Sequence, residues 1–203
     1  MKDNKRWLYA AIAMVLFNIF TFELINTKIG TPIIVKTFID NYIPLVPPFI
    51  VIYHIFMPLI IIIGWYLYKK GETTNLKNYV ISLWMSQIFA YIIFFFFQTD
   101  IPRADLSILP NSIFKTLLEI TYKVDNHYAG CPSLHVANMT ILFMILLKVN
   151  MKKEYKIPIL VLTFLIAIST LLVKQHMFLD LVGGLIHGLI FYYVGKKISQ
   201  IEK

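Results

Sequence analysis

Two histidines in the C-terminal half of the chain stand beside residues that suit them for catalysis. His176 is followed four residues later by Asp180, and residues at this spacing share one face of a helix. Asp180 can accept a hydrogen bond from one imidazole nitrogen, which leaves the other nitrogen as an oriented, neutral nucleophile. The alternative is a buried pair that only packs the helix. Because ionisable residues are uncommon in so apolar a setting, we favour the nucleophile.

The second histidine, His135, closes the run Cys131-Pro132-Ser133-Leu134-His135. A proline near the first position of a helix leaves the next backbone N–H groups unpaired, and such a helix start attracts anions. Ser133 adds a hydroxyl donor to this helix start. Taken alone, the run fits equally well with an ordinary capped helix that carries a histidine at an interface.

An arginine supplies a third group suited to an anion. Arg103 follows the polar run Gln98-Thr99-Asp100, and its guanidinium offers a fixed fork of donors that matches phosphate oxygens. A single arginine in a loop is usually only solvated. Arg103 is of interest because we expect the two histidine clusters to meet it on the same face of the molecule.

The order and spacing of these residues resemble the type 2 phosphatidic acid phosphatase superfamily. The matching positions are Arg103, Pro132-Ser133-x-His135, Ser169 and His176-x-x-x-Asp180. The resemblance implies that His176 attacks phosphorus, that His135 protonates the leaving oxygen and that Asp180 orients His176. It implies a substrate that is a lipid phosphate and a reaction that requires no cofactor.

The sequence departs from the superfamily pattern at three positions. Phe96 replaces a lysine, Ala104 replaces the proline after the motif arginine, and Thr170 replaces the arginine after the motif serine. Two cationic phosphate ligands are therefore missing. The remaining pattern resembles the branch close to inositol phosphorylceramide synthases, which share Pro-Ser-Leu-His. This likeness favours head-group transfer as the alternative to hydrolysis.

Several residues are candidates for holding the phosphoryl oxygens. The resemblance assigns Arg103, Ser133 and the motif serine, Ser169, to this role. Lys174, two residues before the nucleophile, is expected to replace one missing charge, and Gln98 or Thr99 to supply neutral hydrogen bonds. No cluster of Asp, Glu, His or Cys has convincing ligand spacing, so we expect no metal.

Apolar helices must position these residues. The chain has 203 residues, of which 58% are apolar, and a mean hydropathy of +0.70, which is outside the usual range of soluble domains. A helix that crosses the ~30 Å hydrocarbon core needs about 20 mostly apolar residues. Six stretches approach that length, and we expect an all-α, polytopic membrane protein that forms one domain over residues 1–203. They are Trp7 to Ile25, Ile50 to Tyr68, Tyr79 to Phe97, Pro132 to Leu147, Ile157 to Val173 and Phe178 to Val194.

The basic residues divide unequally between the two ends of these spans. One side receives 13 and the other six of the 19 lysines and arginines, so the positive-inside rule places both termini in the cytoplasm and the histidine clusters outside. This distribution explains the net charge of +8 without nucleic acid as a partner. On the outer side, the stretches Ile34 to Pro48 and Leu109 to Val124 are expected to lie along the membrane interface, the second as a helix opened by Pro110-Asn111-Ser112.

The sequence therefore predicts a membrane enzyme that hydrolyses a phosphomonoester or pyrophosphate of a lipid. Phosphatidic acid, phosphatidylglycerol phosphate and polyprenyl pyrophosphate are the candidate substrates. Lipid phosphotransfer is the alternative, and a transporter or non-enzymatic membrane protein is a remote one. The pattern does not indicate an oligomeric state.

Overall fold

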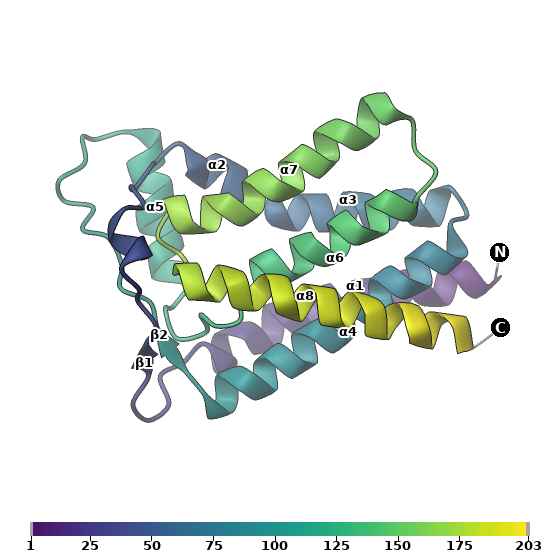
Figure 1. The fold of residues 1–203 in the computed structure, drawn as a ribbon, viewed down its shortest axis with the longest axis horizontal. Helices are drawn as coiled ribbons and strands as arrows, with labels where there is room; N and C mark the ends of the chain where they lie inside the picture. The colour runs from purple at the N-terminus through teal and green to yellow at the C-terminus, as the bar shows by residue number, and fades with distance from the viewer. Residues whose placement is uncertain (1, 202–203) are drawn as a thin grey trace.

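Long apolar helices make up most of the chain in the computed structural model, which describes residues 2–201 and the side chains of residues 5–201 other than Glu23. Figure 1 shows that α1 begins and α8 ends at the same end of the bundle. The helices are α1 (Lys2–Ile25), α2 (Phe49–His54), α3 (Phe56–Lys69), α4 (Thr73–Phe96), α5 (Ile113–Val124), α6 (Leu134–Lys148), α7 (Lys153–Leu172) and α8 (Phe178–Ile201).

Within the described residues 2–201, five segments are long and apolar enough to cross a membrane: α1, α2 with α3, α4, α7 and α8. The second predicted span is interrupted at Ile55, where α2 ends and α3 begins. The fourth predicted span is α6, which has 15 residues. At 1.5 Å per residue this helix is about 22 Å long, shorter than the ~30 Å hydrocarbon core. Five membrane-spanning candidates are thus found, and the sixth remains a prediction.

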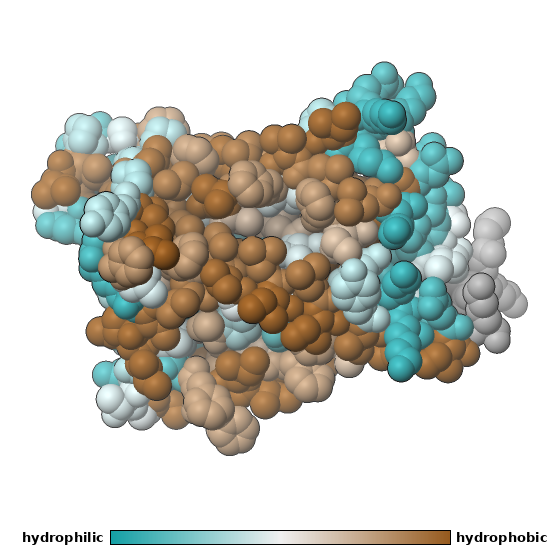
Figure 2. Space-filling view, viewed as in Figure 1, coloured by the Kyte–Doolittle hydropathy of each residue, from teal (hydrophilic) through white to brown (hydrophobic). Residues whose placement is uncertain are grey.

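The surface supports a membrane setting. In Figure 2 the middle of the bundle is covered by hydrophobic side chains, and hydrophilic ones gather at its two ends. Large apolar side chains such as Phe164 on α7 and Ile186 on α8 are more than half exposed. A soluble protein rarely exposes so continuous an apolar surface, so the lipid bilayer is the expected solvent of this band.

The packing of α8 against α6 and α4 brings backbones into close approach. A Cβ atom at Gly184 would lie 2.5 Å from the carbonyl oxygen of Ser133, and one at Gly188 would lie 2.5 Å from that of Ala137. Small residues permit this distance between membrane helices. Because Gly184 packs on Ser133, the N-terminal ends of α6 and α8 are held side by side.

The end of the bundle opposite the termini carries the connections that frame these helix starts (Figure 1). Two short strands, β1 (Ile33–Ile34) and β2 (Thr99–Asp100), pair in parallel there. The hydroxyl of Thr99 accepts hydrogen bonds from the N–H groups of Gly130 and Cys131, at 3.0 and 3.1 Å, and so fixes the loop before α6.

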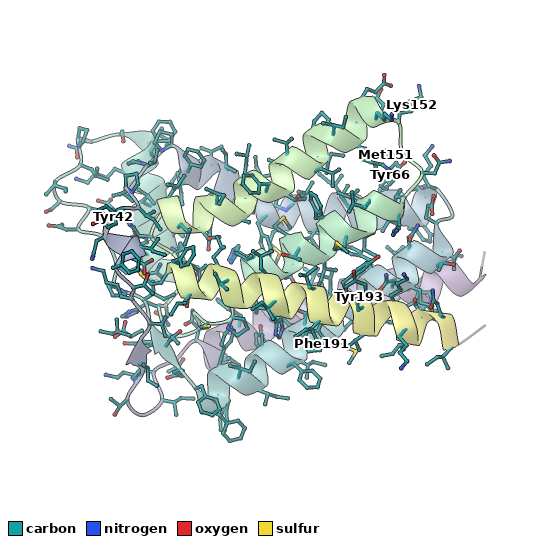
Figure 3. All side chains as sticks on the ribbon, viewed as in Figure 1. Tyr42, Tyr66, Met151, Lys152, Phe191 and Tyr193 are labelled. Atoms are coloured by element: carbon teal, nitrogen blue, oxygen red, sulfur yellow. The ribbon has the colours of Figure 1, made fainter. Side chains whose placement is uncertain are left out.

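The two segments expected at the interface differ in structure. The segment Leu109 to Val124 contains α5, whose start is capped by the Ser112 side chain, as predicted. The segment Ile34 to Pro48 contains only a short 3₁₀ helix, Ile39–Asn41. Figure 3 shows Tyr42 at this end of the molecule, and Tyr66 and Lys152 toward the other.

Candidate active site

The loop between α7 and α8 places His176. The carbonyl oxygen of Thr170 accepts hydrogen bonds from the N–H groups of Gln175 and His176, at 2.9 and 3.1 Å. Lys174 adopts the left-handed region with φ 54°, which is uncommon for a residue other than glycine. This turn reverses the chain, so His176 is held at the start of α8 rather than on a helix.

The imidazole of His176 faces the carboxylate of Asp180. His176 Nδ1 lies 3.5 Å from Asp180 Oδ2, and Asp180 is fully buried. Asp180 Oδ2 also accepts a hydrogen bond of 2.8 Å from the N–H of Met177. Within the described part of the chain, His176 Nδ1 and Asp180 Oδ1 have no hydrogen-bond partner. The pair is therefore aligned but slightly longer than a hydrogen bond, a spacing that commonly tightens when substrate binds.

The N-terminal end of α6 meets this pair. The N–H of Ser133 donates to the carbonyl oxygen of Asp180 at 3.0 Å, and the Ser133 hydroxyl caps α6 by accepting from Val136 N–H at 3.3 Å. The N–H groups of Leu134 and His135 come too early for an intrahelical acceptor. No described residue accepts a hydrogen bond from them. These two donors give the helix start the capacity to bind an anion.

The two histidine rings lie edge to face, with their centroids 5.8 Å apart. His135 is held against Tyr53 and Phe56, with ring centroids 4.6 and 4.2 Å from its own. This aromatic support fixes the orientation of the His135 ring. The two imidazoles are therefore neighbours, one at the start of α6 and the other in the loop before α8.

Arg103 lies beside the His176 loop but is engaged by protein oxygens. Its terminal nitrogens donate to Lys174 O, Gln175 Oε1, Asp125 O and Asn126 O. Burial lowers the pKa of Arg103, and the Asp125 carboxylate opposes that shift. Arg103 thus connects the loop after α5 to the loop before α8 by hydrogen bonds. In this arrangement it positions the loops beside the site.

Lys174, expected to supply a missing charge, directs its ammonium group elsewhere. Lys174 Nζ donates to the carbonyl oxygen of Ile43 at 2.5 Å. Burial lowers the pKa of Lys174, and nearby Asp40 opposes this shift. The Asp40 carboxylate accepts from the N–H of Phe178, the first residue of α8, at 2.7 Å. Lys174 and Asp40 therefore tie the segment before α2 to the start of α8.

Gln98 and Ser169 likewise make structural contacts. The Gln98 amide donates to Thr27 O at 2.7 Å and accepts from Ile29 N–H at 2.6 Å, which orders the turn after α1. The buried Ser169 hydroxyl donates to Ile166 O at 2.7 Å within α7. Contact of these two side chains with phosphate remains a prediction.

The structure adds Gln175 to the site. Its side chain is 2% exposed, and its Nε2 has no hydrogen-bond partner in the described part of the chain. Because Arg103 holds the Oε1 atom, the N–H donors of the amide are directed away from the arginine. The sequence gives no signal for this role beyond the position of Gln175 next to His176.

Asp125 is a second residue that the sequence did not single out. Its carboxylate accepts hydrogen bonds from Asn26 Nδ2 at 2.9 Å and from the Tyr53 hydroxyl at 3.2 Å. Burial raises the pKa of Asp125, while the Arg103 guanidinium opposes that rise. This carboxylate stands where the C-terminal end of α5 meets the site.

Two adjoining cavities reach the histidines. A recess of about 20 Å³, room for about one water molecule, touches His176 and Gln175. A cavity of about 470 Å³ touches His135 and is lined by residues of all six helices from α1 to α6. Phe22, Asp125 and Leu134 line both. Among the described residues no group of three or more His, Cys, Asp or Glu side chains is placed to hold a metal ion.

Comparison with known families gives one match. A family model described as the PAP2 superfamily matches residues 26–194, a range that includes both histidines, Asp180 and Arg103. No curated protein and no solved structure matches the chain significantly.

Proposed function

We propose that this chain is a membrane enzyme of the lipid phosphatase type, because it belongs to the PAP2 superfamily. The observation that carries the proposal is the pairing of His176 with His135, 5.8 Å apart, with Asp180 behind His176. A nucleophile, an orienting carboxylate and a proton donor thus stand around one position. These are the groups that a two-step phosphoryl transfer requires.

The reaction runs through a phosphohistidine. His176 Nε2 attacks phosphorus while the bond from phosphorus to the lipid oxygen breaks, and protonated His135 donates its proton to that oxygen. Asp180 accepts the Nδ1 hydrogen of His176, keeps the correct tautomer and stabilises the cationic ring. Water then attacks the phosphohistidine with His135 as base, which restores both histidines and releases phosphate.

Neutral donors replace the two missing cations of the superfamily pattern. The N–H groups of Leu134 and His135 and the amide of Gln175 have no hydrogen-bond acceptor among the described residues, and they are the donors proposed to bind the phosphoryl oxygens. Fixed donors of this kind stabilise charge on phosphoryl oxygens without reorganising during the reaction. Arg103 contributes by holding the Gln175 amide.

We infer that this site faces the outer side of the membrane. The starts of α6 and α8, where the histidines lie in the sequence, are at the end of the bundle opposite the termini (Figure 1), and the excess of basic residues favours a cytoplasmic location of the termini. The larger cavity then gives the lipid part of the substrate a place among the helices, beside the proton donor. Phosphatidic acid, phosphatidylglycerol phosphate and polyprenyl pyrophosphate are the substrates to test.

Transfer to a lipid hydroxyl is the second candidate function. It is favoured by the 470 Å³ cavity at His135, which has room for part of an acceptor lipid after the first alcohol leaves. In that case a lipid hydroxyl replaces water in the second step, and His135 removes its proton.

Phosphate release by purified protein tests the proposal. The protein in detergent is mixed with each candidate lipid, with and without a lipid alcohol as acceptor. We expect inorganic phosphate from at least one lipid, and its loss in His176→Ala. His127→Asn is the matched control, because His127 contacts Asp100 and lines neither cavity. Activity of His176→Ala equal to that of this control contradicts the proposal.

A further inference from the structure

Two amide side chains face the larger cavity without partners. Gln87 on α4 is 2% exposed and Asn138 on α6 is 5% exposed. Among the described residues, neither Gln87 Nε2 nor Asn138 Oδ1 has a hydrogen-bond partner, and both residues line the 470 Å³ cavity. One atom is a donor and the other an acceptor.

Their neighbours do not remove this need. The Tyr91 hydroxyl donates its proton to Asn18 Oδ1 at 2.9 Å, and its oxygen, which could accept from Gln87 Nε2, lies near that atom without accepting a hydrogen bond from it. His54 and Thr121, which also line the cavity, pair with each other at 3.0 Å. A buried amide without a partner is unfavourable in a protein interior. Two such groups in one cavity therefore indicate a ligand that supplies the missing donor and acceptor.

The polar lining of this cavity differs from the lining of a neighbouring apolar cavity. A cavity of about 310 Å³ between α1, α3 and α4 is lined almost entirely by apolar side chains, such as Ile12, Met14 and Leu83. That kind of lining suits an alkyl chain, which makes no directional contacts. Gln87 and Asn138 instead distinguish ligands by a polar group.

The position of Asn138 relates this polar group to the reacting oxygen. Asn138 is three residues after His135, so both lie on one face of α6 and about 4.5 Å apart along the helix axis. His135 is the proposed donor to the leaving oxygen. A group bound at Asn138 is then about three covalent bonds from that oxygen.

We propose that Gln87 and Asn138 form a subsite for a hydroxyl group on the lipid alcohol, carried by the carbon next to the one that bears the reacting oxygen. The hydroxyl donates to Asn138 Oδ1 and accepts from Gln87 Nε2. This inference rests on the proposed function, and it narrows the substrate class. Phosphatidylglycerol phosphate has such a hydroxyl in its leaving alcohol, whereas phosphatidic acid and polyprenyl pyrophosphate have none.

Binding of two matched alcohols tests the subsite without relying on catalysis. The probes are 1-oleoylglycerol and 1-oleoyl-1,3-propanediol, which differ only in the hydroxyl on the middle carbon. Stabilisation of the purified, detergent-solubilised protein against thermal unfolding reports binding, because a ligand that binds the folded state raises the melting temperature. We expect the glycerol probe to bind at least about tenfold more tightly, as sites that hydrogen-bond a hydroxyl discriminate strongly against its absence.

The variants Gln87→Leu and Asn138→Leu assign the preference to these residues. Both substitutions replace an unpartnered polar group with an apolar one of similar size, so they should fold. Each should reduce the preference to below about threefold, while Thr140→Val, which lies outside this cavity, should retain it. Equal binding of the two probes by the unaltered protein, or an unchanged preference in both leucine variants, overturns the subsite.

The outcome for the subsite is separate from that for the proposed function. Selective binding without phosphate release from any lipid keeps the subsite and removes the phosphatase proposal. Phosphate release with equal binding of both probes keeps the phosphatase proposal and removes the subsite.

Discussion

At the residue scale, the arrangement of the two histidines depends on one carboxylate, that of Asp180. Asp180 is fully buried and lies 3.5 Å from His176 Nδ1. Asp180→Asn keeps the size of the side chain, but its amide can donate to His176 and hold the wrong tautomer. We expect a loss in kcat on the order of 10⁴, as when the carboxylate of a catalytic triad is replaced by an amide. Near-normal steady-state turnover of a short-chain substrate would exclude the orienting role.

We expect opposite effects on activity from substitutions of Gln175 and Lys174, although the two residues are adjacent in sequence. Gln175 presents a free amide to the site, and Lys174 donates to Ile43 O. Loss of one donor to a transition-state oxyanion costs about 10² to 10³ in rate. We therefore expect Gln175→Leu to lose about 10² in kcat and Lys174→Gln to lose less than about threefold. A short-chain soluble substrate, with vanadate inhibition measured in parallel, checks both variants.

A large loss in Lys174→Gln, with weaker vanadate inhibition, would instead place Lys174 in the phosphate site. That result would restore the role that the sequence assigns to it.

Residue types and spacing predicted His135, His176 and Asp180 as site residues, and the structure brings these three side chains close together. Residue types and spacing did not predict Gln175 or Asp125. The roles of those two residues come from loop contacts with Arg103 over more than 20 residues of separation, and such contacts leave no periodic signal in the sequence. The direction of the Lys174 side chain follows from the left-handed turn, and the residue types do not predict that turn either.

At the scale of elements, the packing of α6 on α8 sets the separation of the two histidines. A Cβ at Gly184 would lie 2.5 Å from the Ser133 backbone, whereas one at the adjacent Gly183 would lie 3.1 Å from the Cys131 side chain. Gly184→Ala should therefore push the helices apart and cost about 1–3 kcal/mol of stability. Gly183→Ala, the matched control, should cost less, because its neighbour is a side chain.

The two variants are compared by their thermal unfolding in detergent and by their phosphatase activity. Equal stability and equal activity in both would show that contact between α6 and α8 does not position the site.

Most helices follow from hydrophobic stretches, because a helix that faces lipid must satisfy its backbone internally. Hydrophobic stretches alone do not predict the break at Ile55 or the short length of α6. Pro58 accounts for the break, because it has no N–H to donate to the carbonyl oxygen of His54 and its ring clashes with that carbonyl. The start of α6 is set by Ser133, whose N–H is bound by Asp180 O on another helix.

At the scale of the whole molecule, the orientation in the membrane determines which side the site faces. Ser107 belongs to the loop between β2 and α5, and both of these elements lie at the end of the bundle opposite the termini (Figure 1). In a Cys131→Ser background, Ser107→Cys should be labelled by a membrane-impermeant maleimide on intact cells. Lys152→Cys, between α6 and α7, should be labelled only after permeabilisation. The opposite pattern would reverse the orientation and place the site in the cytoplasm.

The central claim is that His176 carries the phosphoryl group. Purified His135→Ala is mixed with a radiolabelled phosphate ester that has a good leaving group, quenched at high pH, where phosphohistidine survives, and digested for peptide mapping. The account predicts label on the peptide that contains His176, because the good leaving group needs no proton, and no label in the double variant His135→Ala, His176→Ala. Turnover without label on His176, or label that persists in the double variant, would contradict it.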